Sequence, residues 1–439
     1  MTLQAANDYS RLVFDENAAL VGPDGATLVT TIAASGATDL FVMSHGWGNQ
    51  AADAENLYAA MFPLIDAALP NAAGAAYLGV FWPSIWFPDA PAGQSAEVAS
   101  AVAAGAPGQA DAVQSGAEIA TALAVSLPAH ADALHTMGAL IDAGVAAVDS
   151  GAPTDHDAAL GTFHSLFQSV FATPQQATED SGESHLINTA DPRTAYAAVS
   201  EAMGSAPPAA DTQGLGDVFG TIWNGAKDAL RVGSYYTMKG RAGTIGAQGL
   251  GPFLTRLHQA APGLRVHLIG HSFGARLVSY SLAGIPSAAA SPIASVTLVQ
   301  GAFSHWCFTE AAQNPFGSAG GLCGVTDRVH GPYAATFTSA DWAVGVWYPK
   351  ASCLAGQDAQ DYEGPGRWAG MGSDGYQGVS PTAALTLPLG AGTQLDAGTF
   401  YDVDANAVIT DTSQSSFAGA HSDIRHPEVA ALIAAAATA

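Results

Sequence analysis

The stretch at residues 264–280, LRVHLIGHSFGARLVSY, decides how this chain is interpreted. Its first half is apolar and partly β-branched, as in a buried strand, and its second half has the apolar spacing of a helix. Between the halves lies Ser272, with Gly270 before it and Gly274 after it. A tight turn that brings strand and helix close together leaves no room for side chains at the two glycine positions. The pattern predicts a serine at the amino end of a helix, where outward-facing N–H groups can stabilise an oxyanion.

Regular patterns on both sides of this stretch predict a mostly parallel sheet flanked by helices. Residues 11–33 are expected to form a hairpin around GPDG, which is a turn signal. Buried strands are expected at residues 39–44, 76–82, 295–300 and 334–338, with one more near the carboxyl end in FYDVDANAVIT. Helical patterns follow several of these strands and also close the chain. This alternation is typical of an α/β fold.

Residues 89–226 differ from the rest of the chain. They are rich in alanine, glycine and proline, contain several helical patterns and carry few strand signals. Loops in compact domains are much shorter than this segment, so it is expected to pack as a unit of its own. The predicted organisation is therefore an α/β core at residues 1–88 and 227–439, with a helical cap inserted at 89–226.

Composition excludes some classes of partner. The formal net charge is −25, and such a surface repels polyanions, so nucleic-acid binding is not expected. The long uncharged run at residues 277–309 contains two prolines and a strand pattern, so no membrane span is expected. The amino terminus lacks a basic segment followed by an apolar one. A cytoplasmic location is therefore expected, with secretion left open. The sequence does not indicate an oligomeric state.

Metal and disulfide signals are weak. The three cysteines, Cys307, Cys323 and Cys353, form no C-x-x-C pair, and no H-E-x-x-H motif is present. No metal site and no cofactor are expected. Whether Cys307 and Cys323 form a disulfide stays open, because spacing alone does not decide it.

Around Ser272 the chain resembles the α/β-hydrolase superfamily, and within it the serine esterases and lipases that carry a large cap. The resemblance covers roughly residues 11–89 and 233–439. It rests on Gly270-His271-Ser272-Phe273-Gly274 and on His45-Gly46 after a predicted strand. It implies a Ser-His-acid triad in which the acid and then the histidine follow the serine along the chain.

Two residues fit these roles best. His421 lies in a small-residue loop between the last predicted strand and the last helix, whereas His426 precedes Pro427 and is expected to begin that helix. Asp341 follows a predicted strand, where the superfamily places its acid, and Glu310 is the main alternative. The resemblance therefore implies Ser272 as nucleophile, His421 as base and Asp341 as the acid that orients it.

The oxyanion hole and the substrate pocket are predicted less directly. The resemblance implies backbone N–H donors from Phe273, the residue after the nucleophile, and from Trp47 in the glycine-rich loop. Several aromatic residues follow predicted strand ends and either line the pocket or pack the cap against the core. The candidates for substrate binding are Trp82, Trp86, Phe87 and Trp342.

The expected activity is hydrolysis of a small-molecule hydrophobic carboxylic ester through an acyl-enzyme, without cofactor or metal. The same triad also serves acyl transfer to an alcohol other than water, and amide cleavage. A third alternative, from a different class, is a relative without catalysis that binds a ligand through its cap. Acyl chain length and leaving group are not determined by the sequence.

Overall fold

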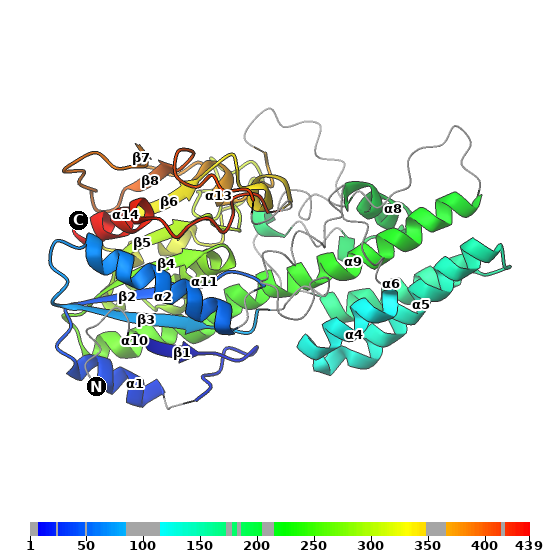
Figure 1. Ribbon diagram of the computed structural model, residues 1–439, viewed down its shortest axis with the longest axis horizontal. Coiled ribbons are helices and arrows are strands. Elements are labelled where there is room, and N and C mark those ends of the chain that lie inside the picture. Colours follow the sequence, from blue (N-terminus) through cyan, green and yellow to red (C-terminus); the bar gives the residue numbers. More distant parts are fainter. Residues whose placement is uncertain are drawn as a thin grey trace.

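A single parallel sheet forms the centre of the molecule. The computed structural model describes residues 8–22, 25–48, 51–84, 115–172, 178–181, 186–203, 215–347, 366–413 and 418–439. Its eight strands follow the order β1-β3-β2-β4-β5-β6-β8-β7, and every neighbouring pair is parallel. The strands are β1 (Ser10–Val13), β2 (Asp39–Ser44), β3 (Ala75–Phe81), β4 (Arg265–His271), β5 (Ile293–Val299), β6 (Tyr333–Phe337), β7 (Thr382–Thr386) and β8 (Phe400–Asp404). The expected α/β class is thus confirmed, and Figure 1 shows the sheet with its helices.

Helices cover both faces of this sheet. Along β2, Phe41 and Met43 pack on one face with α2 (Ala51–Ala68) and α14 (Pro427–Ala437). Leu40 and Val42 point to the other face, where α1 (Gly25–Ala34), α10 (Gly251–Ala260) and α11 (Phe273–Ser281) pack. Since side chains alternate along a strand, the stretch Leu40 to Met43 of β2 is apolar at every position and is buried on both sides.

The predicted amino-terminal hairpin is wrong. Strand β1 pairs in parallel with β3, and residues 25–34, whose β-branched side chains suggested a second strand, form helix α1. The buried residues of α1 are Gly25, Val29 and Ile32, which recur at helical spacing. The helix packs on α10, so tertiary contact outweighs the local strand propensity. The sequence patterns also missed β7, a short edge strand that is mostly exposed.

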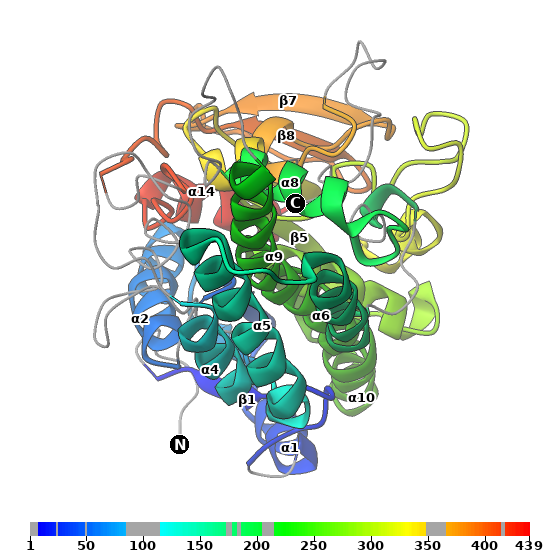
Figure 2. The ribbon, with the colours of Figure 1, turned by 90° about the vertical axis from the view of Figure 1, so that its right-hand side faces the viewer.

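A helical layer lies between β3 and β4 in the chain. It contains α4 (Gly116–Ser126), α5 (Ala131–Ser150), α6 (His156–Phe171), α8 (Pro192–Met203) and α9 (Leu215–Thr244). Figure 2 shows α4, α5, α6 and α9 in front of the sheet when the molecule is viewed from that side. Helices α4 and α5 approach so closely that a Cβ on Gly138 would lie 2.6 Å from the carbonyl oxygen of Gly116.

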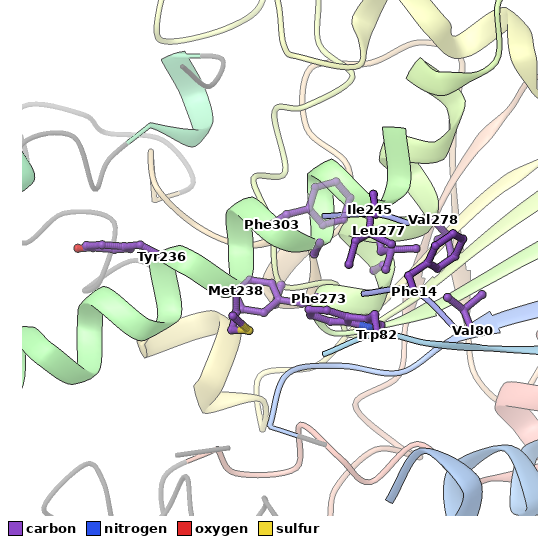
Figure 3. Close-up of a cluster of buried hydrophobic side chains, with 14 of the residues drawn as sticks. Phe14, Val80, Trp82, Tyr236, Met238, Ile245, Phe273, Leu277, Val278 and Phe303 are labelled. Carbon is purple, nitrogen blue, oxygen red and sulfur yellow. The ribbon is translucent and has the colours of Figure 1, made fainter. Parts of the chain in front are cut away.

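Helix α9 joins this layer to the core. It passes without a break through residue 226, where a domain boundary was expected, and continues through the π-helix η3 (Ile245–Leu250) into α10. Figure 3 shows Met238 of α9 and Ile245 of η3 close to Phe273 and Leu277 of α11 and to Trp82 after β3. The hydrophobic core therefore runs from the sheet into the helical layer. Within the described ranges, no helix has the length and apolar character needed to span a bilayer.

Buried ions also join the two parts. Asp180, in the short 3-10 helix Thr178–Asp180, accepts a hydrogen bond from Arg276 of α11 and lies 3.0 Å from the Lys239 ammonium of α9. All three side chains are almost completely buried. Because unpaired buried charges are costly, this arrangement holds the 178–181 segment against both helices.

Candidate active site

Ser272 lies at the carboxyl edge of the sheet, at the turn from β4 into α11. Its backbone has φ 57° and ψ −125°, a conformation that is strained for a residue with a side chain. The flanking glycines make the turn possible. A Cβ on Gly274 would lie 2.2 Å from the carbonyl oxygen of Ser44, and one on Gly270 would lie 2.4 Å from the Cα of Ala275.

The position of β4 in the sheet explains why a site forms there. Strands β3 and β1 lie on one side of β2, whereas β4 and β5 lie on the other. The connections that leave the carboxyl ends of β2 and β4 therefore run in opposite directions. In open α/β sheets, ligands bind at the crevice that such a reversal creates.

Ser272, His421 and Asp341 form a continuous chain of hydrogen bonds. His421 Nε2 lies 2.8 Å from Ser272 Oγ, and His421 Nδ1 lies 2.7 Å from Asp341 Oδ2. The carboxylate accepts from Nδ1–H, which leaves Nε2 free to accept from the hydroxyl. The three residues are separated by 149 and 80 positions from one another along the chain, and only the parallel sheet brings them together.

The backbone holds His421 beside Asp341. Ala420 N–H donates to the carbonyl oxygen of Ala340 at 2.8 Å, and Trp342 N–H donates to that of Ala418 at 3.1 Å. A Cβ on Gly419, whose φ is 61°, would lie 2.2 Å from the Ala340 oxygen. The small-residue loop that suggested His421 in the sequence is therefore required for this close approach.

The alternative residues lie elsewhere. His426 precedes α14 and its Nε2 lies 2.8 Å from Asp423 Oδ1. Glu310 is exposed to solvent. Neither has a hydrogen bond to Ser272 or His421 among the described residues, so the geometry favours His421 and Asp341 over both.

Sequence patterns missed Gln300, which follows β5 and is completely buried. Its Nε2 donates to Asp341 Oδ2 at 2.8 Å, and its Oε1 accepts from Thr336 Oγ1 at 2.9 Å. Asp341 Oδ1 accepts from the Val344 N–H at 3.0 Å. Both carboxylate oxygens are thus fixed, and Oδ2 is aimed at His421. The signal in the sequence that could have identified Gln300 is its position directly after a buried strand.

The glycine-rich loop after β2 lies against the serine. A Cβ on Gly46 would be 2.6 Å from Ser272 Cβ. The backbone N–H of Trp47, the next residue, therefore lies close to the turn at Ser272. Phe273 is the first residue of α11. Rings of Trp47 and Phe273 lie 6.3 Å apart, and Tyr235 of α9 contacts both. Of the two residues expected to supply backbone donors, Phe273 directly follows Ser272, and Trp47 follows Gly46, which lies against Ser272.

His45 holds this loop in place. Its Nδ1 donates to the Gly46 carbonyl oxygen at 2.9 Å, and its Nε2 accepts from the Trp82 N–H at 3.3 Å. The rings of His45 and Trp82 stack with centroids 5.4 Å apart. Burial lowers the pKa of His45 to about 4, so the ring is neutral at pH 7 and has the tautomer that these bonds require.

His271 supports the backbone on the other side. Its Nε2 donates to the carbonyl oxygen of His421 at 2.9 Å. Burial is the main reason that its pKa falls to about 3, and the nearby His421 contributes. His271 is therefore neutral at pH 7, and it contacts His421 through this hydrogen bond and through the two rings, whose centroids lie 5.0 Å apart.

The four aromatic candidates for substrate binding differ in their exposure and contacts. Trp82 is 4% exposed and is occupied by its contacts with His45, which makes it a packing residue. Trp342 is 38% exposed and adjoins Asp341, so it remains available to a ligand. Trp86 and Phe87 lie outside the described residues. Tyr235, which had no distinguishing signal in the sequence, adds an aromatic ring beside Trp47 and Phe273.

Neither a disulfide nor a metal-binding cluster is found among the described residues. Cys307 and Cys323 are both free thiols in the structure, which settles the question of a disulfide between them, and Cys353 lies outside the described residues. Across the described ranges, no group of three or more His, Cys, Asp or Glu side chains is placed to hold a metal ion.

Comparison with known proteins does not assign the chain. No protein-family model, curated protein or solved structure matches it. The functional argument therefore rests on the geometry of the site.

Proposed function

We propose that this protein is a serine hydrolase of the α/β-hydrolase type that cleaves carboxylic esters. The observation that carries the proposal is the hydrogen-bonded chain from Asp341 through His421 to Ser272, placed at the carboxyl edge of a parallel sheet. A strained serine between a buried strand and a helix is the arrangement in which this type of hydrolase exposes its nucleophile.

The proposed reaction uses only side chains and backbone of this chain. His421 Nε2 takes the proton of Ser272 as Oγ attacks the ester carbonyl carbon. The N–H groups of Phe273 and Trp47 stabilise the oxyanion of the tetrahedral intermediate. His421 then returns the proton to the departing alcohol, which leaves an acyl-enzyme. A water molecule, deprotonated by His421, releases the carboxylic acid and restores Ser272.

Asp341 makes these steps possible by orienting the imidazole and stabilising its protonated form. It is buried, and its position is fixed by Gln300 and the Val344 N–H. Since the carboxylate does not have to reorganise during the reaction, its interaction with the imidazolium acts fully in the transition state.

We further propose that α4 to α9 form a cap over the site and that the substrate is hydrophobic. The contacts of Tyr235 of α9 with the rings of Trp47 and Phe273 support this proposal. Pockets for apolar acyl or alcohol groups are lined by aromatic side chains of this kind.

Fluorophosphonate labelling tests the proposal. Intact-mass analysis of the wild-type chain should show one adduct, and Ser272→Ala should show none. Ser165→Ala, on the exposed surface of α6, is the matched control and should label like the wild type. p-Nitrophenyl esters from acetate to dodecanoate, measured in parallel, should lose turnover by about 10⁴-fold or more in Ser272→Ala.

The remaining outcomes separate the alternatives. Turnover that Ser272→Ala retains would contradict the proposed nucleophile. Faster product formation on added alcohol, with ester as product, would identify an acyltransferase, and activity on a parallel amide series would identify an amidase. A folded wild-type chain that neither labels nor turns over any ester would indicate a binding protein.

A further inference from the structure

A cavity whose lining does not include Ser272, His421 or Asp341 lies beside α9. It has a volume of about 730 Å³, is open to solvent on one side, and is bordered by residues following β1 and β3, the turn after α4, the end of α6 and one face of α9. On α9 it is lined by Thr237, Gly240, Arg241 and Thr244, which recur at helical spacing. Tyr235 and Lys239 occupy the opposite face of this helix, toward α11. The cavity is therefore separated from the proposed active site by the thickness of α9.

Among the described residues that line this cavity, Arg241 is the strongly basic one. Its Nη1 donates to the Pro83 carbonyl oxygen at 2.7 Å and lies 4.0 Å from the Met238 sulfur. Among the described residues, the guanidinium makes no further hydrogen bond, and Glu16 is the charged group that acts on it electrostatically. A guanidinium carries five N–H donors, so most of them remain for a ligand.

The surroundings disfavour an uncompensated charge at this position. Partial burial is the main reason that the pKa of Arg241 falls below its ordinary value, and Glu16 opposes the shift from a distance. Glu16 lies at the exposed rim of the cavity and is solvated. A partly buried cation without a close counter-ion is stabilised when an anion enters beside it.

The cavity also offers an apolar region. Val125, at the rim, is 82% exposed, which is unusual for a valine on the surface of a folded domain. Leu127 and Val170 also line the cavity. The volume lies within the range of small-molecule pockets, which combine an apolar lining with a few polar groups that fix orientation.

We propose that this cavity binds a small molecule with one carboxylate and an apolar body, the carboxylate paired with Arg241 and the body against Val125 and Val170. A single planar guanidinium matches a carboxylate with two parallel hydrogen bonds. A ligand with several negative charges fits less well, because Glu16 and the net charge of −25 repel it. This site is independent of the proposed ester chemistry.

Isothermal titration of the full chain at pH 7 tests the proposal with two probes of equal size, hexanoate and hexanamide. Hexanoate should bind with a dissociation constant below about 10 mM, and hexanamide at least about tenfold more weakly. Ser272→Ala should bind hexanoate like the wild type, which distinguishes this cavity from the proposed active site. Arg241→Gln should weaken hexanoate binding by about 10- to 100-fold and remove the preference over the amide.

A second variant, which fills the cavity, tests the proposal even if Arg241→Gln fails to fold. A Cβ on Gly240 would meet no atom within 4 Å, so Gly240→Leu extends into open space and also removes a helix-destabilising glycine. It should fold like the wild type and lose hexanoate binding. Gly161→Leu is the matched control, because its Cβ is equally unobstructed on the exposed surface of α6, and it should bind normally.

Three results would overturn the proposal. These are no saturable binding of hexanoate up to about 50 mM, equal affinity for hexanoate and hexanamide, or unchanged binding in Gly240→Leu. The last result would place the acid at another site.

Discussion

Replacing His271 with glutamine should make the fold less sensitive to acid. In the folded protein the pKa of His271 is about 3, mainly because the ring is buried, whereas an unperturbed histidine titrates near 6.5. Between these two values the unfolded chain binds a proton that the folded chain does not bind. The free energy of unfolding therefore falls as the pH decreases below about 6.5.

The size of the effect follows from the same two values. A pH of 5 lies about 1.5 units below the pKa of histidine in the unfolded chain, and each unit changes the free energy of unfolding by about 1.36 kcal/mol. His271 should therefore remove roughly 2 kcal/mol of stability between pH 8 and pH 5. His45, whose pKa is about 4, acts in the same direction.

Two carboxyl groups act in the opposite direction, so a variant is needed to isolate His271. Burial raises the pKa of Glu179 to about 7 and that of Asp402 to about 6. These groups bind protons more readily in the folded state, and their contribution to stability rises as the pH falls. In His271→Gln both contributions remain, while the amide can still donate to the His421 carbonyl oxygen.

Urea unfolding followed by tryptophan fluorescence at pH 8 and pH 5 measures the effect. The loss of stability between the two values should be roughly 2 kcal/mol smaller in His271→Gln than in the wild type. His135→Gln, on the exposed surface of α5, should behave like the wild type. An unchanged pH dependence in His271→Gln would refute the reasoning that this ring is kept neutral by burial.

Two further substitutions test how the site and the helical layer are held. Gln300→Met removes the hydrogen-bond donor to Asp341 Oδ2. It should lower kcat for p-nitrophenyl esters by about 10- to 100-fold with little change in KM. An unaltered kcat would mean that Gln300 does not position the acid. Asp180→Ala leaves the buried cations Lys239 and Arg276 without their shared carboxylate and should cost about 3–5 kcal/mol in urea unfolding. Asp157→Ala, the exposed control, breaks the ion pair with Arg193 and should lower the free energy of unfolding by less than about 1 kcal/mol. Equal losses in Asp180→Ala and Asp157→Ala would contradict the importance of burial.

Features that depend on neighbouring residues were predictable from the sequence. The turn from β4 into α11 needs glycines two residues before and after Ser272, because the built Cβ atoms would lie within 2.5 Å of backbone atoms. Such a constraint is local, so it appears directly in the pattern of residues. The strands β2 to β6 were predicted for a similar reason, since a strand buried on both faces is mostly apolar along its length.

Features that depend on remote packing were predicted poorly. The β-branched residues of α1 have strand propensity, but the helix is stabilised by burying Val29 and Ile32 against its neighbours. Strand β7 is short, lies at the edge of the sheet and has an exposed face, so little hydrophobic signal marks it.

The sequence by itself determined the α/β class, the strained position of Ser272 and a short set of residues able to act with it, because these follow from local sterics and from the order of elements along the chain. The resemblance to a known family had implied His421 and Asp341, but only the tertiary structure shows that His421 is hydrogen-bonded to Ser272, 149 residues away, and to Asp341, 80 residues away. It also decided the hydrogen bonds of Gln300 with Asp341 and of Arg241 with the Pro83 carbonyl oxygen. Such contacts leave no periodic pattern in the sequence, because each depends on two segments that meet only when the sheet and its helices have formed.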